Sequence, residues 1–395
     1  MRVFWFCIPA YGHTNPSIEV VRELVRRGHE VRYYSFDEFR AKIEDTGAAF
    51  VRCDEFLPPI DAASERRLHK VSTTEMSVRS FQTTALMDAT VAADVERYSP
   101  DLVVSDSACF WGKLFCQKHH LPLVISTTTF AFNRYSAQYM KSSASELADM
   151  VFGLPRVNRE LRKLRGLGFD VKSALDIVQN KEDDDTIVYT SRLFQPCADS
   201  FDSSHYRFVG PSLRAVEPRE KTGTPLVYVS LGTVINDHPD FYRSCIEAVA
   251  GQDVELLISC GQSFDASALG ELPANVTVEH AVDQLDVLSR ASLFVTHCGM
   301  NSVSEGLYLG VPLLLFPLTG EQRAVARRAE EVGAGVPLDP RAAKDPAAMW
   351  EALAAALGDG GLLDGAARMR DNFCSCEGPA GAADFIESRL ASARS

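Results

Sequence analysis

Residues 293–322 read LFVTHCGMNSVSEGLYLGVPLLLFPLTGEQ, and this stretch decides the fold of the chain. Its first four residues are apolar and β-prone, which predicts a buried strand of a parallel sheet. The sequence Ser-Val-Ser-Glu at 302–305 fits a capping box, so we expect a helix that begins near Asn301 or Ser302. A strand, a short turn and a helix in this order indicate an α/β sheet.

The turn at residues 297–299 lies where α/β proteins bind ligands. Backbone N–H groups at a helix start point at whatever lies above the strand, and the helix dipole adds roughly half a positive charge there. The turn therefore predicts an anion site at the carboxyl edge of the sheet. A second apolar strand at 313–316 would bring residues 319–322 to the same edge.

Length and composition limit the possible functions. A chain of 395 residues is long for one core and predicts two domains of about 200 residues. The net charge of −13 argues against nucleic acid as a partner, because phosphate binding needs a basic face. The longest apolar run, 307–318, is too short to span a bilayer, and the N-terminus lacks a signal-peptide cleavage site. We expect a cytoplasmic protein, with buried free thiols at Cys7, Cys109, Cys116, Cys245 and Cys260.

The N-terminus predicts the start of a doubly wound sheet. Residues 3–8 predict a strand and 9–14 a loop, and Asn15-Pro16 opens a helix with proline at its favoured first position. A second strand follows at 30–34. The loop sequence PAYGHTNP holds one glycine, whereas a dinucleotide fingerprint needs three.

Two polar residues follow predicted strands in this first half. His13 would lie in the loop after the first strand, and its place at a strand end favours a functional role over that of a loop histidine bonded to backbone. Asp106 follows the predicted buried strand 102–105, where it would either cap the next helix or hold a functional group.

These motifs resemble those of a known family. Residues 293–322 are similar to the nucleotide-sugar signature of family 1 glycosyltransferases, and GHTNP at 12–16 is similar to their N-terminal motif. The whole pattern most resembles the bacterial macrolide-glycosyltransferase-like branch. The resemblance implies the α/β GT-B fold, two Rossmann-like, doubly wound parallel-sheet domains facing across a cleft. The acceptor domain would span 1–213, the nucleotide-sugar domain 214–378, and a helix at 379–395 would cross back to the first domain.

The resemblance also implies an activity. The chain would be an inverting glycosyltransferase that moves a hexose, glucose from UDP-glucose, to a hydroxyl of a small apolar acceptor such as a macrolide or a polyphenol. His13 would act as the base, and Asp106 would hold it and stabilise its protonated form. We expect no metal ion and no cofactor, only the donor and acceptor as partners, no membrane insertion, and a monomer or homodimer.

The remaining site residues would hold the donor. The resemblance assigns the phosphates to the turn after the strand at 226–231 and to the signature helix start, the base to the loop before Gln284, and the sugar to residues 321–322. Glu305 would bind the ribose, with the capping box as its alternative role. The predicted donor set is Ser230, Thr233, Val282, Gln284, His297, Gly299, Asn301, Ser302, Glu305, Glu321 and Gln322. The base loop departs from the family pattern, since Ala281 and Asp283 replace an aromatic residue and a proline.

Two other functions fit parts of this pattern. A GT-B nucleotide-sugar epimerase would need catalytic carboxylates in the cleft and no apolar acceptor pocket. A non-catalytic nucleotide-sugar-binding protein would have no need of the His13 and Asp106 pair. The aromatic residues between 130 and 139 fit either an acceptor pocket or a helix packed in the core.

Overall fold

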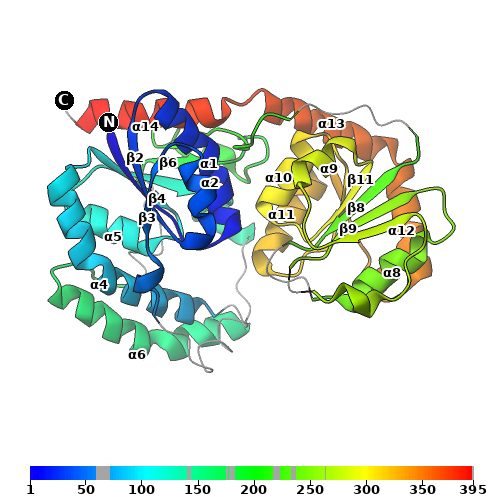
Figure 1. The fold of residues 1–395 in the computed structure, drawn as a ribbon, viewed down its shortest axis with the longest axis horizontal. Helices are drawn as coiled ribbons and strands as arrows, with labels where there is room; N and C mark the ends of the chain where they lie inside the picture. Colours follow the sequence, from blue (N-terminus) through cyan, green and yellow to red (C-terminus); the bar gives the residue numbers. More distant parts are fainter. Residues whose placement is uncertain are drawn as a thin grey trace. The chain divides into compact units, whose positions relative to one another are not determined.

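The computed structural model describes residues 1–58, 72–139, 144–174, 177, 183–216, 223–232, 237–262 and 264–393. The chain divides into two compact α/β units (Figure 1). Unit 1 contains Met1–Tyr189, Cys197–Ser212 and Glu377–Ser395, and unit 2 contains Thr190–Pro196 and Leu213–Cys376. The short segment Thr190–Pro196 was not anticipated as part of the second unit.

The described part of unit 1 holds a seven-stranded parallel sheet in the order β3-β2-β1-β4-β5-β6-β7. The central strands are almost wholly buried, as expected when both faces of a parallel sheet are covered. The strands are β1 (Arg2–Phe6), β2 (Glu30–Ser35), β3 (Ala49–Arg52), β4 (Leu102–Asp106), β5 (Leu123–Thr127), β6 (Thr186–Val188) and β7 (Tyr206–Phe208).

Helices cover both faces of this sheet (Figure 1). One layer contains α1, α2 and α14, and the opposite layer contains α5, against which α4 packs, with α6 outermost on α4. Their bounds are α1 (Tyr11–Arg26), α2 (Arg40–Glu44), α4 (Thr73–Tyr98), α5 (Phe110–Lys118), α6 (Ala144–Gly166) and α14 (Gly378–Ala393), with short 3₁₀ turns at Asp37–Phe39, Asp54–Phe56, Ser136–Tyr139 and Ala198–Ser200. Over residues 128–139 the aromatic stretch after β5 forms the 3₁₀ turn Ser136–Tyr139 and no α-helix, and within it Phe130 is buried and Tyr135 is half exposed.

Unit 2 repeats the architecture with a six-stranded parallel sheet in its described residues, ordered β10-β9-β8-β11-β12-β13. Its strands are β8 (Leu226–Ser230), β9 (Glu255–Ser259), β10 (Val276–Glu279), β11 (Leu293–Thr296), β12 (Leu313–Leu315) and β13 (Gly335–Pro337). The helices are α8 (Pro239–Val249), α9 (Gln284–Arg290), α10 (Met300–Tyr308), α11 (Gly320–Glu331), α12 (Pro346–Gly358) and α13 (Gly360–Cys374), with 3₁₀ turns at Ala266–Leu269 and Pro340–Ala343.

Each sheet has one point where the strand order reverses. In unit 1 the switch lies between β1 and β4, and in unit 2 between β8 and β11. At both points the paired strands end level, since Phe6 pairs with Ser105 and Thr296 pairs with Ser230. The loops that follow such strands diverge and leave room for a ligand at the carboxyl edge. The fold therefore fixes one candidate site in each unit.

The last helix, α14, packs against α1 in unit 1. The guanidinium of Arg27 donates to Asp384 at 2.6 Å and to Glu387 at 2.8 Å, and the Nε2 atom of His29 lies 2.6 Å from Glu387. These contacts anchor the end of the chain to the helix that carries one of the candidate site residues.

The segment Thr190–Pro196 is held inside unit 2 by a buried aromatic ring. Phe194 is fully buried and meets Phe373 edge to face, with 5.8 Å between ring centroids. The guanidinium of Arg328 donates to the carbonyls of Leu193 at 2.6 Å and Phe194 at 3.2 Å. Unit 2 thus completes its core with residues that precede the last strand of unit 1.

All ten cysteines are free thiols, and the five predicted to be buried are buried, which confirms that prediction. Within the described residues, the structure contains no helix that is both long and apolar enough to cross a membrane.

Candidate active site

Three side chains from neighbouring strands meet at the switch point of unit 1. The Nδ1 atom of His13 lies 2.8 Å from Asp106 Oδ2 and 3.2 Å from Thr128 Oγ1. His13 follows β1, Asp106 ends β4, and Thr128 follows β5, so parallel strands deliver all three to one edge. The structure brings the two predicted residues together and adds Thr128, which directly follows β5 and which the sequence analysis missed.

The predicted loop around His13 is wrong, because α1 begins at Tyr11, four residues before Asn15. Ala10 is the N-cap, and its carbonyl accepts from the backbone N–H of His13 at 3.0 Å and of Thr14 at 2.9 Å. Pro16 was read as the first helical residue, but it is the sixth. His13 therefore lies in the first helical turn, where the backbone fixes its position.

Asp106 is 1% exposed and uses both carboxylate oxygens. Oδ1 accepts from the backbone N–H of Ala108 at 2.9 Å, and Oδ2 faces His13. The alternative role as a helix cap is wrong, because the N-cap of α5 is Cys109 and no side chain caps it.

These contacts assign the tautomer of His13. An ionised carboxylate only accepts hydrogen bonds, so Nδ1 carries the proton that points at Asp106. Nε2 is then the basic nitrogen of the neutral ring. The His13 side chain is 27% exposed, whereas Asp106 is sealed from water. The arrangement can accept a proton at Nε2 and balance the resulting charge with a buried carboxylate.

The switch point of unit 2 is built around a second histidine, His297. Its imidazole lies between two glycines: a Cβ on Gly232 would come within 2.7 Å of Nε2, and one on Gly299 within 2.6 Å. Gly232 also has a φ of +83°, a conformation that favours glycine. Burial lowers the pKa of His297 to about 4, so the ring is neutral at pH 7. Its buried Nδ1 has no group in hydrogen-bond geometry within the described residues.

The capping box predicted at 302–305 is wrong, because α10 begins at Met300 with Gly299 as its N-cap. Cys298, the residue before it, is buried and has a φ of +67°, an unusual conformation for a residue with a side chain. This sharp turn starts the helix directly after His297. Asn301 and Ser302 are therefore the second and third helical residues, and their N–H groups belong to the helix start.

A hydrogen-bonded network joins α10 to α9. The amide of Gln284 donates from Nε2 to Glu305 Oε2 at 2.6 Å and lies 3.4 Å from Ser302 Oγ. Tyr228, on the central strand β8, donates its hydroxyl to Gln284 Oε1 at 3.1 Å. The structure thus brings together three predicted donor-site residues, Gln284, Ser302 and Glu305.

The other predicted donor residues border this network. Ser230 ends β8 and accepts from the N–H of Gly232 at 3.3 Å, and Val282 lies half buried just before α9. Thr233 lies outside the described residues. Asp283, which replaces a proline, caps α9 and binds the guanidinium of Arg214 through both oxygens at 2.7 and 2.6 Å.

A capping box does exist in the signature stretch, at the start of α11. Thr319 accepts from the N–H of Gln322 at 3.4 Å, and Gln322 Oε1 accepts from the N–H groups of Leu318 and Thr319 at 2.7 and 3.0 Å. Backbone N–H groups therefore engage the side-chain carbonyl oxygen of Gln322, and the N–H₂ group of the same side chain can donate to a ligand. Glu321 is exposed beside it.

Comparisons with known proteins identify the family of the chain. Residues 216–359 match the family model described as UDP-glucoronosyl and UDP-glucosyl transferase. The NDP-glycosyltransferase YjiC of Bacillus licheniformis is 33% identical over 98% of this chain and 97% of its own length. The chain belongs to the family 1 glycosyltransferases. Demethyllactenocin mycarosyltransferase of Streptomyces fradiae is 32% identical over 99% of the chain and 87% of its own length.

Solved structures of glycosyltransferases share the fold. The glycosyltransferase of kitacinnamycin superposes with a TM-score of 0.81 at 28% identity, covering 98% of both chains. The calicheamicin glycosyltransferase gives 0.78 at 28% identity, covering 99% of this chain and 98% of its own. These matches confirm the predicted α/β GT-B fold, the enzyme class and the bacterial branch of the family.

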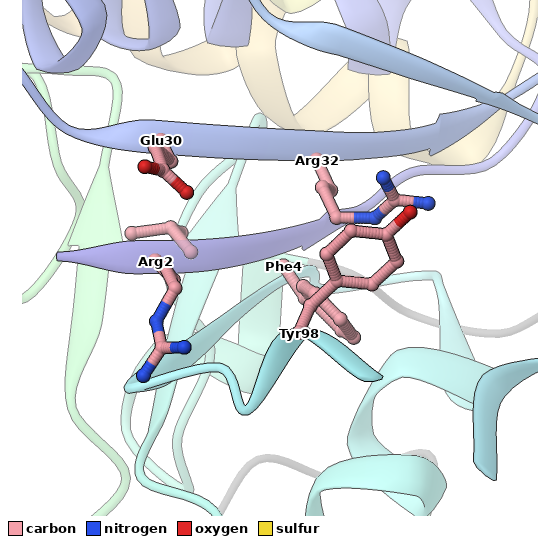
Figure 2. A pocket seen from close by; sticks show the side chains of 6 residues that line it. Arg2, Phe4, Glu30, Arg32 and Tyr98 are labelled. Atoms are coloured by element: carbon pink, nitrogen blue, oxygen red, sulfur yellow. The ribbon is translucent and has the colours of Figure 1, made fainter. Parts of the chain in front are cut away.

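A small cavity lies at the opposite edge of the unit 1 sheet, at the amino ends of β1 and β2 (Figure 2). It measures about 20 Å³, room for roughly one water molecule. The guanidinium of Arg32 lies over the Tyr98 ring at 3.7 Å and near Asp94 at 3.2 Å, so packed side chains close it. The cavity is too small for a sugar, and none of the predicted site residues lines it.

Within the described part of the chain, no group of three or more His, Cys, Asp or Glu side chains could hold a metal ion. In the acidic run at 183–185, the carboxylate of Asp185 pairs with His205 Nδ1 at 3.0 Å and with the guanidinium of Arg389 at 3.4 Å.

Proposed function

We propose that this glycosyltransferase moves glucose from UDP-glucose to a hydroxyl of a small apolar natural product, with inversion at the anomeric carbon. Unit 1 holds the acceptor and unit 2 the donor. The observation that carries the proposal is the 2.8 Å contact between His13 Nδ1 and Asp106 at the switch point of unit 1. Ten free thiols fit a reducing compartment, which supports the cytoplasm as its location.

The proposed chemistry begins at His13. Its Nε2 takes the proton from the acceptor hydroxyl while the oxygen attacks the anomeric carbon of the sugar. A hydroxyl is a poor nucleophile at neutral pH, so a positioned base of near-neutral pKa accelerates the attack. Asp106 balances the imidazolium that forms, and Thr128 helps to orient the ring. Attack opposite the leaving phosphate inverts the configuration.

The donor is held by its diphosphate at the switch point of unit 2. As the bond between the sugar and the phosphate oxygen breaks, negative charge grows on UDP. Backbone N–H groups at the start of α10 and the neutral His297 ring stabilise that charge as fixed dipoles. Because the helix start already supplies donors, no cation is required.

The other parts of the donor meet separate residues. Glu305 and Gln284 bind the ribose, and the loop at Val282 binds the base. The hydrogen bond between the side chains of Gln284 and Glu305 supports this assignment. Glu321 accepts from sugar hydroxyls, and Gln322 donates to them, since its carbonyl caps α11. Glu321 is exposed, so the bound sugar itself would displace water from the carboxylate, and sugar hydroxyls have to replace the lost hydrogen bonds, which favours a fully hydroxylated hexose.

Incubation with a mixed panel of apolar acceptors and several nucleotide sugars, followed by mass spectrometry, tests this function. The panel must include a deoxysugar donor, because one relative is named a mycarosyltransferase. With UDP-glucose we expect the acceptor to gain one hexosyl group. The NMR coupling constant at the anomeric carbon of the product should be that of the anomer opposite to the donor's. Sugar interconversion without any acceptor would indicate an epimerase. Donor binding with neither transfer nor hydrolysis would indicate a binding protein.

A further inference from the structure

The outer surface of α6 carries a cluster of exposed apolar side chains. Met150, Val151, Phe152 and Leu154 lie within five residues and are 42%, 62%, 83% and 50% exposed. Single exposed apolar residues are ordinary on protein surfaces, but a cluster of this kind marks an interaction site.

The inner face of α6 is firmly fixed, so the exposure is not the result of loose packing. A Cβ on Gly153 would meet the side chain of Thr74 at 2.2 Å, which shows how closely α6 approaches α4. Asp149 accepts from the backbone N–H of Thr74 at 3.1 Å, and Arg156 pairs with the buried Glu75 at 2.7 Å. With this face held, residues 150–154 present their remaining side chains to solvent.

Residues 156–165 of α6 are rich in basic side chains. They include one acid, Glu160, which is 2% exposed and pairs with Arg159 and Lys163. The side chains of Arg159 and Lys163 are themselves 59% and 57% exposed. The basic run, 156–165, contains Arg156, Arg159, Arg162, Lys163 and Arg165. Its five cations outnumber Glu75 and Glu160, the two carboxylates that they contact, so the run has a net positive charge on a protein whose net charge is −13.

We propose that α6 is a membrane-contact surface for anionic bilayers. The apolar run 150–154 enters the boundary between headgroups and acyl chains, and the basic run 156–165 binds lipid phosphates. Helices of this composition lie on membranes without crossing them, and each basic residue near an anionic surface strengthens the attraction. The inference goes beyond the proposed function and does not depend on it.

Charge complementarity favours a lipid surface over a second copy of the chain. A headgroup layer offers an apolar boundary and negative phosphates together, so it matches both runs of α6. In one two-fold dimer the apolar run would pack against its own copy, and the basic run would then face no opposite charge. In another, the apolar run would pack against the basic run of the second copy, and the two surfaces would match poorly. An anionic bilayer therefore satisfies the whole surface.

Sedimentation of the full chain with lipid vesicles tests the proposal. We expect binding to vesicles of equal parts phosphatidylcholine and phosphatidylglycerol, little binding to phosphatidylcholine alone, and release at high salt, which screens exposed charges. Phe152→Asp should weaken binding by at least about tenfold, because it removes one large apolar side chain and adds a negative charge. The double variant Arg162→Gln and Lys163→Gln should weaken binding to anionic vesicles without altering the apolar run.

Leu363→Asp is the matched control, since Leu363 is 45% exposed on α13 of unit 2. It should bind vesicles as the wild type does, and thermal melting should show that all variants are folded. The proposal is overturned if the wild type does not sediment with anionic vesicles, or if Leu363→Asp loses as much binding as Phe152→Asp. It is also overturned if light scattering shows a dimer that Phe152→Asp dissociates while vesicles bind neither protein.

Discussion

At the switch point of unit 1, His13 is held by two side chains, Asp106 and Thr128. At the switch point of unit 2, the His297 ring fills space that is open because Gly232 and Gly299 have no side chains. Both histidines follow a buried strand and lie at the start of a helix. This difference in surroundings fits the roles proposed above, a base that takes up a proton in unit 1 and a donor-binding group in unit 2.

The electrostatics follow the same division. Asp106 gives His13 a partner of opposite charge, so the ring can become an imidazolium during a reaction. Burial lowers the pKa of His297 to about 4, so that ring stays neutral at pH 7 and contributes an N–H dipole. The same residue type thus lies in two different electrostatic environments, each of which suits the role proposed for that histidine.

Removal of the base should have the largest effect. His13→Ala should lower kcat by a factor of about 10²–10⁴, the usual contribution of a positioned base. Asp106→Asn keeps the shape but removes the charge, so its loss should be smaller. Because the pair acts as a unit, the double variant should be little worse than His13→Ala alone. Steady-state kinetics measures these losses, and calorimetry should show unchanged binding of UDP-glucose, since unit 2 holds the donor.

Additive losses in the double variant would show that Asp106 acts independently of His13. Near-normal turnover in His13→Ala would remove it as the base.

Filling the space beside His297 should have the second-largest effect. A Cβ on Gly299 would lie 2.6 Å from His297 Nε2, so Gly299→Ala forces the ring to move and should weaken donor binding by roughly 10–100-fold. Gly358→Ala is the matched control, because its Cβ would meet nothing within 4 Å. Calorimetry with UDP-glucose gives both affinities. In a His297→Ala background Gly299→Ala should cost almost nothing further, and a full additional loss there would contradict the steric explanation.

Changing the donor sugar should alter kcat/KM by about one order of magnitude. We expect UDP-glucose to exceed a 2,6-dideoxy donor in kcat/KM by roughly tenfold or more, since a bound deoxysugar would displace water from Glu321 without offering a hydroxyl in its place. Glu321→Ala should reduce that preference. Glu330→Ala, an exposed acid near the other end of the same helix, serves as the control. Equal efficiency of the two donors in the wild type would count against the assignment.

Thr128 should have a smaller effect, because it acts only through His13. Thr128→Val removes one hydrogen bond of 3.2 Å and should lower kcat by about two- to tenfold. Thr128→Ser should restore most of the rate, and the acidic limb of the pH profile should shift in the valine variant alone. An unchanged profile together with a lower melting temperature would make Thr128 purely structural.

Chelation should have no effect. The helix start at Gly299 and the neutral His297 can hold a diphosphate without a cation, so we expect full activity in EDTA. Product formation with and without the chelator measures this. A loss that magnesium or manganese restores would mean that the donor site in unit 2 is completed by a metal.

The sequence predicted the fold class and the clustering of the candidate residues because parallel strands end at one edge. His13 and Asp106 lie 93 positions apart, yet each follows a buried strand, and adjacent strands bring them to 2.8 Å. Thr128 follows the next strand, and the same rule could have found it. The roles of these residues stay predictions.

Helix starts were harder to predict, because short motifs fit several places. Pro16 suits a first helical position, but α1 begins at Tyr11 and tolerates the proline within its second turn. Both 302–305 and 319–322 fit the capping-box pattern, and only the second forms one. The left-handed turn at Cys298 decides the first case, and backbone strain of that kind leaves no pattern in the sequence.

The anchoring of Phe194 in unit 2 bears on how such enzymes can be recombined. The chain passes between the units at four junctions: 189/190, 196/197, 212/213 and 376/377. A chimera that takes the donor half of a relative from residue 213 onward would combine a foreign core with this chain's Phe194 and Leu193. The ring would then face a surface that did not evolve with Phe373 and Arg328. Functional exchange of the donor half therefore requires that the seven residues 190–196 travel with it.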